Sequence, residues 1–266
     1  GSPANEELNG ELMEIYKQQQ KLREQLENKI GKEGKNGVGG NLLKQMEADV
    51  FMAAETNQNW RLPNLRNNLK QTIKRTWPSN RISFSTCQIG DKFLNSEMLP
   101  GGTATMVFDH IAACTVKMGE DEEELSRFSF ITVEGKDSQK LTFITGYQIC
   151  KGSMHGTTTS CMQQKEVIND KEMKHGKETS NPTTEELKIK FITDLITFIK
   201  QLQAAGHDIV LALDANETPT DAIKNGEIKQ GSFSYLLQQT GLTEVSQEHH
   251  RTVPDSTYYH DARSLY

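Results

Sequence analysis

The chain has 266 residues, of which 35% are hydrophobic and 25% are charged, and its formal net charge is -6. This length is enough for one large domain with a substantial core, or for a domain with an appendage. No apolar run approaches the about 20 residues that span a bilayer, so we expect no membrane association, and the acidic balance argues against a general nucleic-acid coat protein.

Cysteine and histidine usage points to a reducing compartment and to no transition-metal site. Cys87, Cys114, Cys150 and Cys161 lack C-x-x-C spacing and are too few for a disulfide framework in a chain of this length. The histidines form no ligand pattern. The polar start shows no basic-then-apolar leader, so we expect an intracellular protein, nuclear or cytoplasmic.

The N-terminal part is predicted to be separate from the rest of the chain. Residues 5–31 read as a charged, Gln-rich helix with a thin apolar stripe, either a coiled-coil arm or a loosely docked helix. The glycine-rich run at 31–40 marks a boundary, and it lacks the G-x-x-x-x-G-K-[ST] spacing of a phosphate loop. We predict a helical arm over 1–34 and one domain over 35–266.

The first acid of interest follows a predicted strand. The apolar run Val50–Ala54 ends in Glu55. A strand end is where the backbone leaves the core and a side chain can reach solvent or substrate. The plain alternative is an acid that pairs with a neighbouring lysine or arginine.

A basic helix is predicted next, from about Asn64 to Trp77. Leu65, Leu69 and Ile73 form its apolar stripe, and Arg66, Lys70 and Lys74 recur beside that stripe at intervals of four. The basic flank is either a solvated face whose long side chains lie along the core edge or a contact surface for phosphates.

The middle of the chain is predicted to be rich in strands, at 82–89, 103–108, 112–117, 128–134 and 141–149. We interpret the acidic run 120–124 as a solvated hairpin tip, and we expect Arg127 to brace a loop or to pair with that run. Tyr147 ends the last of these strands, where it is either a functional residue or an ordinary aromatic at the sheet rim. Residues 151–182 read as a long surface loop with one helix at 161–174.

The last third predicts a capped helix followed by a strand. Thr183 opens a helix that Gly206 ends, and the apolar run Ile209–Leu213 predicts a strand buried on both faces of a sheet. Asp214 and Asn216 follow at the strand end, either as a helix cap or Asx-turn or as functional groups. A helix at 230–240 and a short strand near 242–245 complete the prediction.

Three strands that deliver Glu55, Tyr147 and then Asp214-x-Asn216 resemble the endonuclease/exonuclease/phosphatase superfamily, which has the DNase I-like fold. The runs Pro100–Val107 and Ser126–Phe128 are similar to those of members found beside reverse transcriptases in mobile elements. The resemblance covers roughly residues 36–259, and residues 151–182 fit it poorly.

The resemblance implies an α/β fold, a two-layer β-sandwich flanked by helices, and metal-dependent hydrolysis of DNA or another phosphodiester. It implies Mg²⁺ or Mn²⁺ at Glu55, with Asn36 as a second residue on the metal side. It also implies that Asp214 positions or deprotonates the attacking water, that Asn216 bonds the phosphate or that water, and that Tyr147 donates to a phosphate oxygen. A fused or separate reverse transcriptase is the implied partner.

The chain departs from the family pattern near its end. Superfamily members carry an Arg-hydrophobic-Asp-Tyr strand and then a Ser-Asp-His motif. Here Arg263–Tyr266 places Leu265 at the acidic position, and no Ser-Asp-His occurs. We therefore expect a sandwich that lacks one or more terminal strands, with weak or no hydrolysis. The alternatives are a catalytically dead phosphate-, nucleic-acid- or protein-binding module and a small-molecule or phospholipid phosphoesterase.

Overall fold

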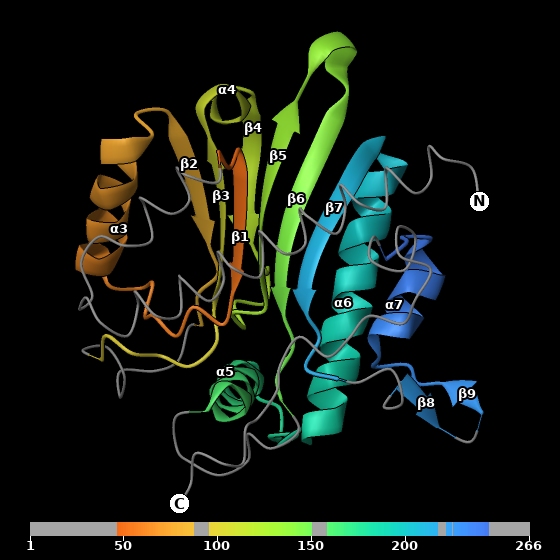
Figure 1. Cartoon of the computed structure of the whole chain (residues 1–266). Helices are drawn as coiled ribbons and strands as arrows, with labels where there is room; N and C mark the ends of the chain where they lie inside the picture. Colours follow the sequence, from red (N-terminus) through yellow and green to blue (C-terminus); the bar gives the residue numbers. More distant parts are fainter. Residues whose placement is uncertain (1–46, 88–95, 151–158, 218–221, 225, 245–266) are drawn as a thin grey trace, which may run out of the picture.

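A computed structural model describes residues 47–87, 96–150, 159–217, 222–224 and 226–244 (Figure 1). The predicted N-terminal arm, the glycine-rich run with Asn36, and residues 245–266 lie outside the described residues. Among the described helices, none is long and apolar enough to cross a lipid bilayer.

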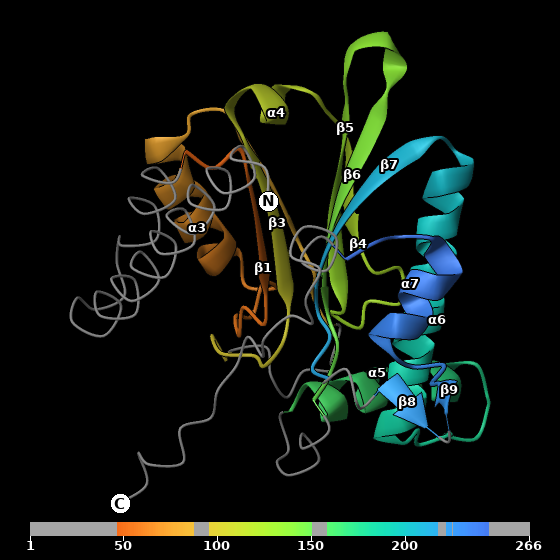
Figure 2. The same cartoon turned by 45° about the vertical axis from the view of Figure 1, so that its right-hand side comes forward.

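Two β-sheets stack face to face and form the centre of the molecule (Figure 2). The first sheet is antiparallel and has the order β1 (Val50–Ala54), β3 (Thr103–Phe108), β2 (Asn80–Phe84). The second has the order β4 (Thr115–Glu120), β5 (Phe128–Glu134), β6 (Lys140–Tyr147), β7 (His207–Asp214), and its last pair, β6 with β7, is parallel. The predicted α/β two-layer sandwich is confirmed.

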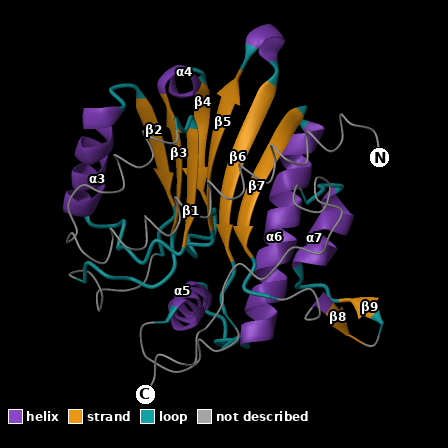
Figure 3. Cartoon of the chain, in the orientation of Figure 1, coloured by secondary structure: helices purple, strands orange, loops and turns teal. Residues whose placement is uncertain are grey.

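Helices cover the outer faces and one end of the sandwich (Figure 3). The helices that cover the two outer faces are α3 (Pro63–Thr76) on the first sheet, with α6 (Thr184–Ala204) and α7 (Phe233–Thr240) on the second. The shorter elements and the end helix are α4 (Asp109–Ala113), the 3-10 turn η2 (Lys136–Ser138), α5 (Ser160–Lys174), β8 (Ile223–Lys224) and β9 (Glu227–Ile228). α5 lies across the end at which β1, β6 and β7 finish, and α4 lies at the opposite end (Figure 1).

The predicted basic helix is confirmed as α3. Pro63 at its first position suits the fixed φ of proline, and basic residues in its last turn face the negative end of the helix dipole. Ile73 is buried, and Leu65 and Leu69 pack beside it against the first sheet. Two flanking tryptophans, Trp60 and Trp77, complete this layer, and Trp77 stacks on Phe108 with ring centroids 4.2 Å apart.

The predicted helix after Thr183 is confirmed as α6. The Thr183 hydroxyl accepts a hydrogen bond from the Glu186 N–H, and the Glu186 carboxylate accepts one from the Thr183 N–H in return. Phe191, Leu195 and Ile199 are buried against the second sheet. Gly206 follows the helix with φ of 77°, a left-handed conformation that suits glycine.

Hydroxyl groups fill the space between the two sheets at the end covered by α5. Thr103 Oγ1 lies 2.9 Å from both Ser85 Oγ and Ser129 Oγ, and Thr105 Oγ1 lies 2.9 Å from Ser129 Oγ and 2.7 Å from Thr145 Oγ1. We call these five residues the hydroxyl ladder. Because Thr103 and Thr105 belong to β3 while Ser129 and Thr145 belong to β5 and β6, the ladder joins the sheets.

The opposite end of the interior is apolar. One strand predicted in this region, at 112–117, is not present as predicted. Val107, Ile131 and Phe143 form a buried cluster with the short helix α4 packed against it. The strand predicted at 112–117 is therefore α4 followed by β4. The apolar residues of 111–113 close the end of the sandwich instead of extending a sheet, and the chain enters this turn at Asp109 with φ of 46°.

The second wrong prediction concerns Asp121, in the acidic run. The run does lie at the turn of the β4–β5 hairpin, and Glu122 and Glu124 are exposed, but the Asp121 side chain is only 2% exposed and pairs with Arg127. The expectation that Arg127 pairs with this run is confirmed.

The third wrong prediction concerns β7. Among the described residues it is an edge strand, with Val210 39% exposed, and it is not buried on both faces. Residues 242–244 form no strand, and the β8–β9 hairpin was not predicted. Helix α5 confirms the predicted helix at 161–174. It buries Cys161 and Val167, so this segment is not entirely the surface loop that was predicted.

Candidate active site

Two strand ends of the second sheet lie side by side at the end covered by α5. Tyr147 ends β6, Asp214 ends β7, and the two residues are paired. Just beyond them, the Gln148 N–H donates to the Asp214 carbonyl over 2.9 Å, and Asn216 Nδ2 donates to the Gln148 carbonyl over 2.7 Å. Asn216 has φ of 46°, a conformation that asparagine tolerates better than most residues. The backbone thus holds Asp214 and Asn216 in one fixed turn.

Glu55 joins this group from the other sheet. It directly follows β1 and has φ of 51°, a left-handed conformation that is uncommon for a non-glycine residue. Asp214 and Tyr147 both lie close enough to its carboxylate to shift its pKa, Asp214 by charge repulsion and Tyr147 as a hydrogen-bond donor. Glu55, Tyr147 and Asp214 therefore meet at one place, although more than one sheet supplies them.

The surroundings of Glu55 oppose its ionisation. Although the Glu55 side chain is exposed, the protein around it removes part of its hydration, and this desolvation, followed by repulsion from Asp214, raises the pKa of Glu55 above its usual value, while the hydrogen bond from Tyr147 acts in the opposite direction. A nearby cation would relieve both costs of ionisation. This is the electrostatic pattern of carboxylates that share a positively charged ligand.

Tyr147 is kept protonated by its surroundings. Its side chain is buried, and desolvation together with the nearby Cys150 and Glu55 raises its pKa far above the usual range. At neutral pH the phenol is therefore a hydrogen-bond donor and not a phenolate. Cys150 Sγ lies 3.8 Å from the phenol oxygen.

Two loops brace each other beside Glu55. The Thr56 N–H donates to the Gly102 carbonyl over 3.1 Å, and the Asn57 N–H donates to the Gly101 carbonyl over 2.9 Å. In return, the Gly101 N–H donates to Asn57 Oδ1 over 3.0 Å. A Cβ on Gly101 would lie 2.7 Å from Ser160 Oγ, so this close approach requires glycine. The loops hold Glu55 in its unusual conformation.

The donor set fits a hard divalent cation. Glu55 and Asp214 supply carboxylate oxygens, and Asn216 supplies an amide, which is the chemistry that Mg²⁺ binds while it keeps several waters. The described residues contain no group of three or more His, Cys, Asp or Glu side chains placed to hold a metal ion. Water or substrate oxygens would therefore complete the coordination. Asn36, the other predicted metal residue, lies outside the described part of the chain.

The predicted basic contact surface lies on an outer flank and not among these side chains. Arg66 Nε donates to the Trp60 carbonyl, and its guanidinium lies 6.0 Å from the centre of the Phe84 ring, so Arg66 is committed to packing. Lys70 and Lys74 are exposed. Helix α3 begins near the end where β1 finishes and runs away from it (Figure 1).

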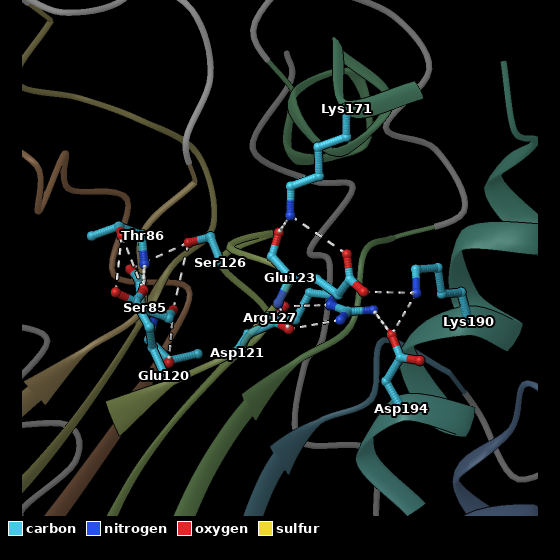
Figure 4. A network of polar contacts seen from close by, with 11 residues as sticks. Ser85, Thr86, Glu120, Asp121, Glu123, Ser126, Arg127, Lys171, Lys190 and Asp194 are labelled. Carbon is cyan, nitrogen blue, oxygen red and sulfur yellow. Dashed lines mark hydrogen bonds and ion pairs between the residues drawn. The ribbon is translucent and has the colours of Figure 1, made fainter. Parts of the chain in front are cut away.

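An ionic network is centred on the buried Arg127 (Figure 4). Arg127 forms two hydrogen bonds to Asp121, of 2.5 and 2.7 Å, and its Nη1 lies 2.8 Å from Asp194 on α6. Lys190 and Asp194 pair on the same helix over 2.9 Å. The Arg127 carbonyl accepts a hydrogen bond of 2.8 Å from the Tyr147 N–H. Arg127 therefore links α6 to the start of β5 and to the end of β6.

Two residues near the site were not predicted from the sequence. Ser160 begins α5 beside Gly101, where an added Cβ would lie 2.7 Å from Ser160 Oγ and 3.4 Å from Tyr147 Cε1, but it lies in the segment that fits the family pattern poorly. The capping residue Thr159 just before it was the available signal for a helix start at this point. Gln148 is buried, and its Nε2 donates to the Gly231 carbonyl over 2.9 Å. It ties the site to the segment before α7.

Several solved structures are similar to most of this chain, at low sequence identity. No protein-family model and no curated protein sequence matches. An AP endonuclease from Archaeoglobus fulgidus is similar, with a TM-score of 0.46 and 14% identity over 85% of this chain and 73% of that one. A mutant of beta toxin from Staphylococcus aureus with bound magnesium ions has a TM-score of 0.38 and 11% identity, over 74% of this chain and 59% of that one. ANGEL2, a 2',3'-cyclic phosphatase, has a TM-score of 0.37 and 12% identity, over 78% of this chain and 51% of that one.

Proposed function

We propose that this protein is a metal-dependent phosphoesterase of the DNase I-like type that hydrolyses a phosphodiester, with DNA as the preferred substrate class. The observation that carries the proposal is the meeting of Glu55, Tyr147 and Asp214, with Asn216 beside them, at the ends of strands from two sheets. Two carboxylates, an amide and a protonated phenol are the groups that such a reaction needs in one place.

Each side chain has a role that its contacts allow. Glu55 and Asp214 would hold Mg²⁺ or Mn²⁺, which, when bound, neutralises charge on the phosphoryl oxygens and favours ionisation of a bound water. Asp214 accepts a proton from the attacking water or orients it. Asn216 commits one N–H to the Gln148 carbonyl, and its second N–H and its oxygen orient the water or the phosphate.

Tyr147 supplies the neutral donor. Burial and the neighbouring Glu55 keep its phenol protonated, so it donates to Glu55 in this state and to a phosphate oxygen when a substrate is present. A donor that is already oriented stabilises developing charge without reorganisation. This role does not depend on a change in its protonation state.

The choice of DNA is the finer part of the proposal. It is supported by the exposed Lys70 and Lys74 on α3 and by the absence of an acid among the residues of that helix. A mobile-element origin, with a reverse transcriptase as partner, is proposed on the motifs at 100–107 and 126–128 alone. A small soluble phosphodiester is the second candidate, because Lys70 and Lys74 lie on an outer flank and not beside Glu55.

The test compares three substrates across a series of Mg²⁺ and Mn²⁺ concentrations: supercoiled plasmid, bis(p-nitrophenyl) phosphate and p-nitrophenyl phosphate. We expect hydrolysis of the diesters that requires metal and falls at least about 10²-fold in Glu55→Gln and Asp214→Asn. Asp208→Asn is the matched control, since Asp208 is an exposed carboxylate at the other end of the same strand. Hydrolysis that survives Asp214→Asn, or no metal-dependent hydrolysis of any substrate, would contradict the proposal.

A further inference from the structure

We propose that Glu217 is a positioning residue, which fixes the turn that carries Asp214 and Asn216 by binding the first N–H of helix α7. The catalytic consequence of this proposal rests on the proposed function. The effect of the Glu217 bond on the turn is a property of the folded chain, and it can be measured without hydrolysis.

The first observation is the partner of Glu217. Glu217 directly follows Asn216, and its Oε1 accepts a hydrogen bond of 2.5 Å from the N–H of Phe233, the first residue of α7. The first N–H groups of a helix have no partner within the helix, and a carboxylate there also faces the positive end of the helix dipole. The N-terminus of α7 therefore gives Glu217 a defined partner that is not part of the proposed metal site.

The second observation is that the start of α7 is itself fixed. Ser232 caps the helix, since its Oγ accepts a hydrogen bond of 3.1 Å from the Tyr235 N–H and donates one of 2.7 Å to the Lys229 carbonyl. Leu236 is buried in the apolar cluster that α7 shares with α6 and the second sheet. Glu217 is thus bonded to a packed helix and not to a loose loop.

The third observation is a second bond to the same segment, from the end of β6. Gln148 is 1% exposed, and its Nε2 donates to the Gly231 carbonyl over 2.9 Å. Gly231 packs against the backbone of Ile189 on α6, where an added Cβ would lie 3.1 Å from the Ile189 nitrogen. Residues 231–233 are therefore bonded to both strand ends, through the Gln148 side chain after β6 and the Glu217 side chain after β7.

These bonds act on Asn216 from two sides. Asn216 Nδ2 donates to the Gln148 carbonyl over 2.7 Å, and the Asn216 N–H donates to Asp214 Oδ1 over 3.3 Å. These two bonds hold Asn216 to the strand ends, and the Glu217 bond holds the chain that follows. Since the φ of 46° at Asn216 is uncommon for a non-glycine residue, loss of the Glu217 bond should let Asn216 leave this conformation more often. The amide would then be displaced from the water or phosphate that it orients.

The first arm of the test compares Glu217→Met with Glu217→Gln on Mg²⁺-dependent hydrolysis of bis(p-nitrophenyl) phosphate. Glutamine keeps an oxygen that can accept from the Phe233 N–H, whereas methionine has a similar length and no oxygen. We expect Glu217→Met to lower kcat about 10-fold, the worth of a hydrogen bond to a charged group, with little change in KM. Glu217→Gln should stay within about 3-fold of the parent chain, because it keeps a neutral acceptor. Equal losses in the two variants, or no loss in Glu217→Met, would overturn the proposal.

Ser232→Ala is the matched control. It removes the cap of the same helix and keeps the Glu217 carboxylate, so it reports what a less stable α7 does by itself. We expect thermal stability to fall while kcat stays near that of the parent chain. A loss of kcat as large as that of Glu217→Met would assign the effect to the stability of α7 and overturn the proposal.

The second arm needs no activity and measures amide hydrogen exchange in the metal-free protein. The Gln148 N–H donates to the Asp214 carbonyl over 2.9 Å, so its exchange rate reports opening of the turn, while the buried Ile144 in the middle of β6 reports opening of the whole sheet. Relative to Ile144, we expect exchange at Gln148 to rise about 10-fold in Glu217→Met and to change little in Glu217→Gln and Ser232→Ala.

Unchanged relative exchange at Gln148 in Glu217→Met would overturn the proposal, even if the protein is an active phosphoesterase. A parent chain that hydrolyses no phosphodiester would end the proposed function, and the exchange rates would still decide whether Glu217 fixes the turn.

Discussion

Tyr147 and Asp214 are direct partners in the parallel pairing of β6 and β7, and each is the last residue of its strand. Residues paired in this way point their side chains to the same face of a sheet. Parallel strands also end on the same side of the molecule. A tyrosine and an aspartate that are far apart in sequence are therefore delivered together, on the face toward β1 and Glu55.

The pKa of Glu55 should move in opposite directions when Asp214 and Tyr147 are replaced. Asp214→Asn removes a repelling charge and should lower the pKa of Glu55, whereas Tyr147→Phe removes a donor and should raise it. Side-chain carboxyl carbon NMR of the metal-free protein measures both shifts. Shifts of the same sign in the two variants would contradict the electrostatic description of the site.

Removal of the Glu55 charge should stabilise the metal-free protein. The pKa of Glu55 is raised in the folded chain, so its contribution to stability is present below the unfolded pKa and is lost as the pH rises through the folded value. At pH 7 the ionised group therefore costs stability, and because Glu55 is exposed and solvent screens its charge, Glu55→Gln should raise Tm without metal only slightly. Added Mg²⁺ should raise Tm of the parent chain and not of this variant. The reverse ranking in a metal-free thermal melt would be incompatible with this account.

Asn216 should be replaced at lower cost by glycine than by alanine. With φ of 46°, alanine at this position is strained by about 1 kcal/mol, whereas glycine is not. Both variants lose the side-chain bond to the Gln148 carbonyl, so both should lose hydrolysis to a similar degree. Urea denaturation separates the two effects. Equal stability of the two variants would mean that the backbone relaxes when the side chain is removed.

Loss of the Arg127 charge should be among the most destabilising changes in the described chain. Arg127→Met leaves Asp121, which is 2% exposed, without its partner, at a cost of about 3–5 kcal/mol. The double variant Arg127→Met/Asp121→Leu should recover most of that loss. Lys190→Met is the control, because Lys190 is 36% exposed and its pair with Asp194 is worth under about 1 kcal/mol. Urea denaturation midpoints should rank the three variants in this order.

The basic flank of α3 is tested by charge reversal. If Lys70 and Lys74 contact phosphates, the double variant Lys70→Glu/Lys74→Glu should weaken DNA binding equally across sequences and reduce the slope of log K against log salt by about 2. Reversal of two exposed lysines elsewhere, Lys136 and Lys200, serves as the control. Binding that changes equally in both double variants would return the flank to a solvated helix face.

Local patterns in the sequence predicted the elements that carry strong periodicity or caps. Ile73 and its apolar neighbours define α3, and Thr183 with Glu186 defines the start of α6. The family pattern selected Glu55, Tyr147 and Asp214 for one site, and the structure places these three side chains together. Their catalytic roles remain predictions.

The errors have a common physical cause, which is that long-range partners decide burial. An apolar run such as Ile209–Leu213 has the same composition whether a strand lies at a sheet edge or at its centre. In the sequence Asp121 looks like a solvated acid, and only its ion pair with Arg127 explains its burial. The sequence likewise does not show that Ser160 lies near Tyr147, because that depends on how α5 packs against the strand ends. The ion pair of Asp121 with Arg127 is local in sequence, whereas the other contacts join distant segments.

The hydroxyl ladder has a mechanical consequence for the sandwich. Apolar faces slide over one another at little cost, but the 2.7 Å contact of Thr105 with Thr145 and the 2.9 Å contact of Thr103 with Ser129 have fixed partners and directions. Any shear of one sheet over the other must break these bonds among buried side chains, at the full cost of unpaired polar groups. Since Glu55 belongs to one sheet and Asp214 to the other, resistance to shear keeps the spacing of the two carboxylates constant.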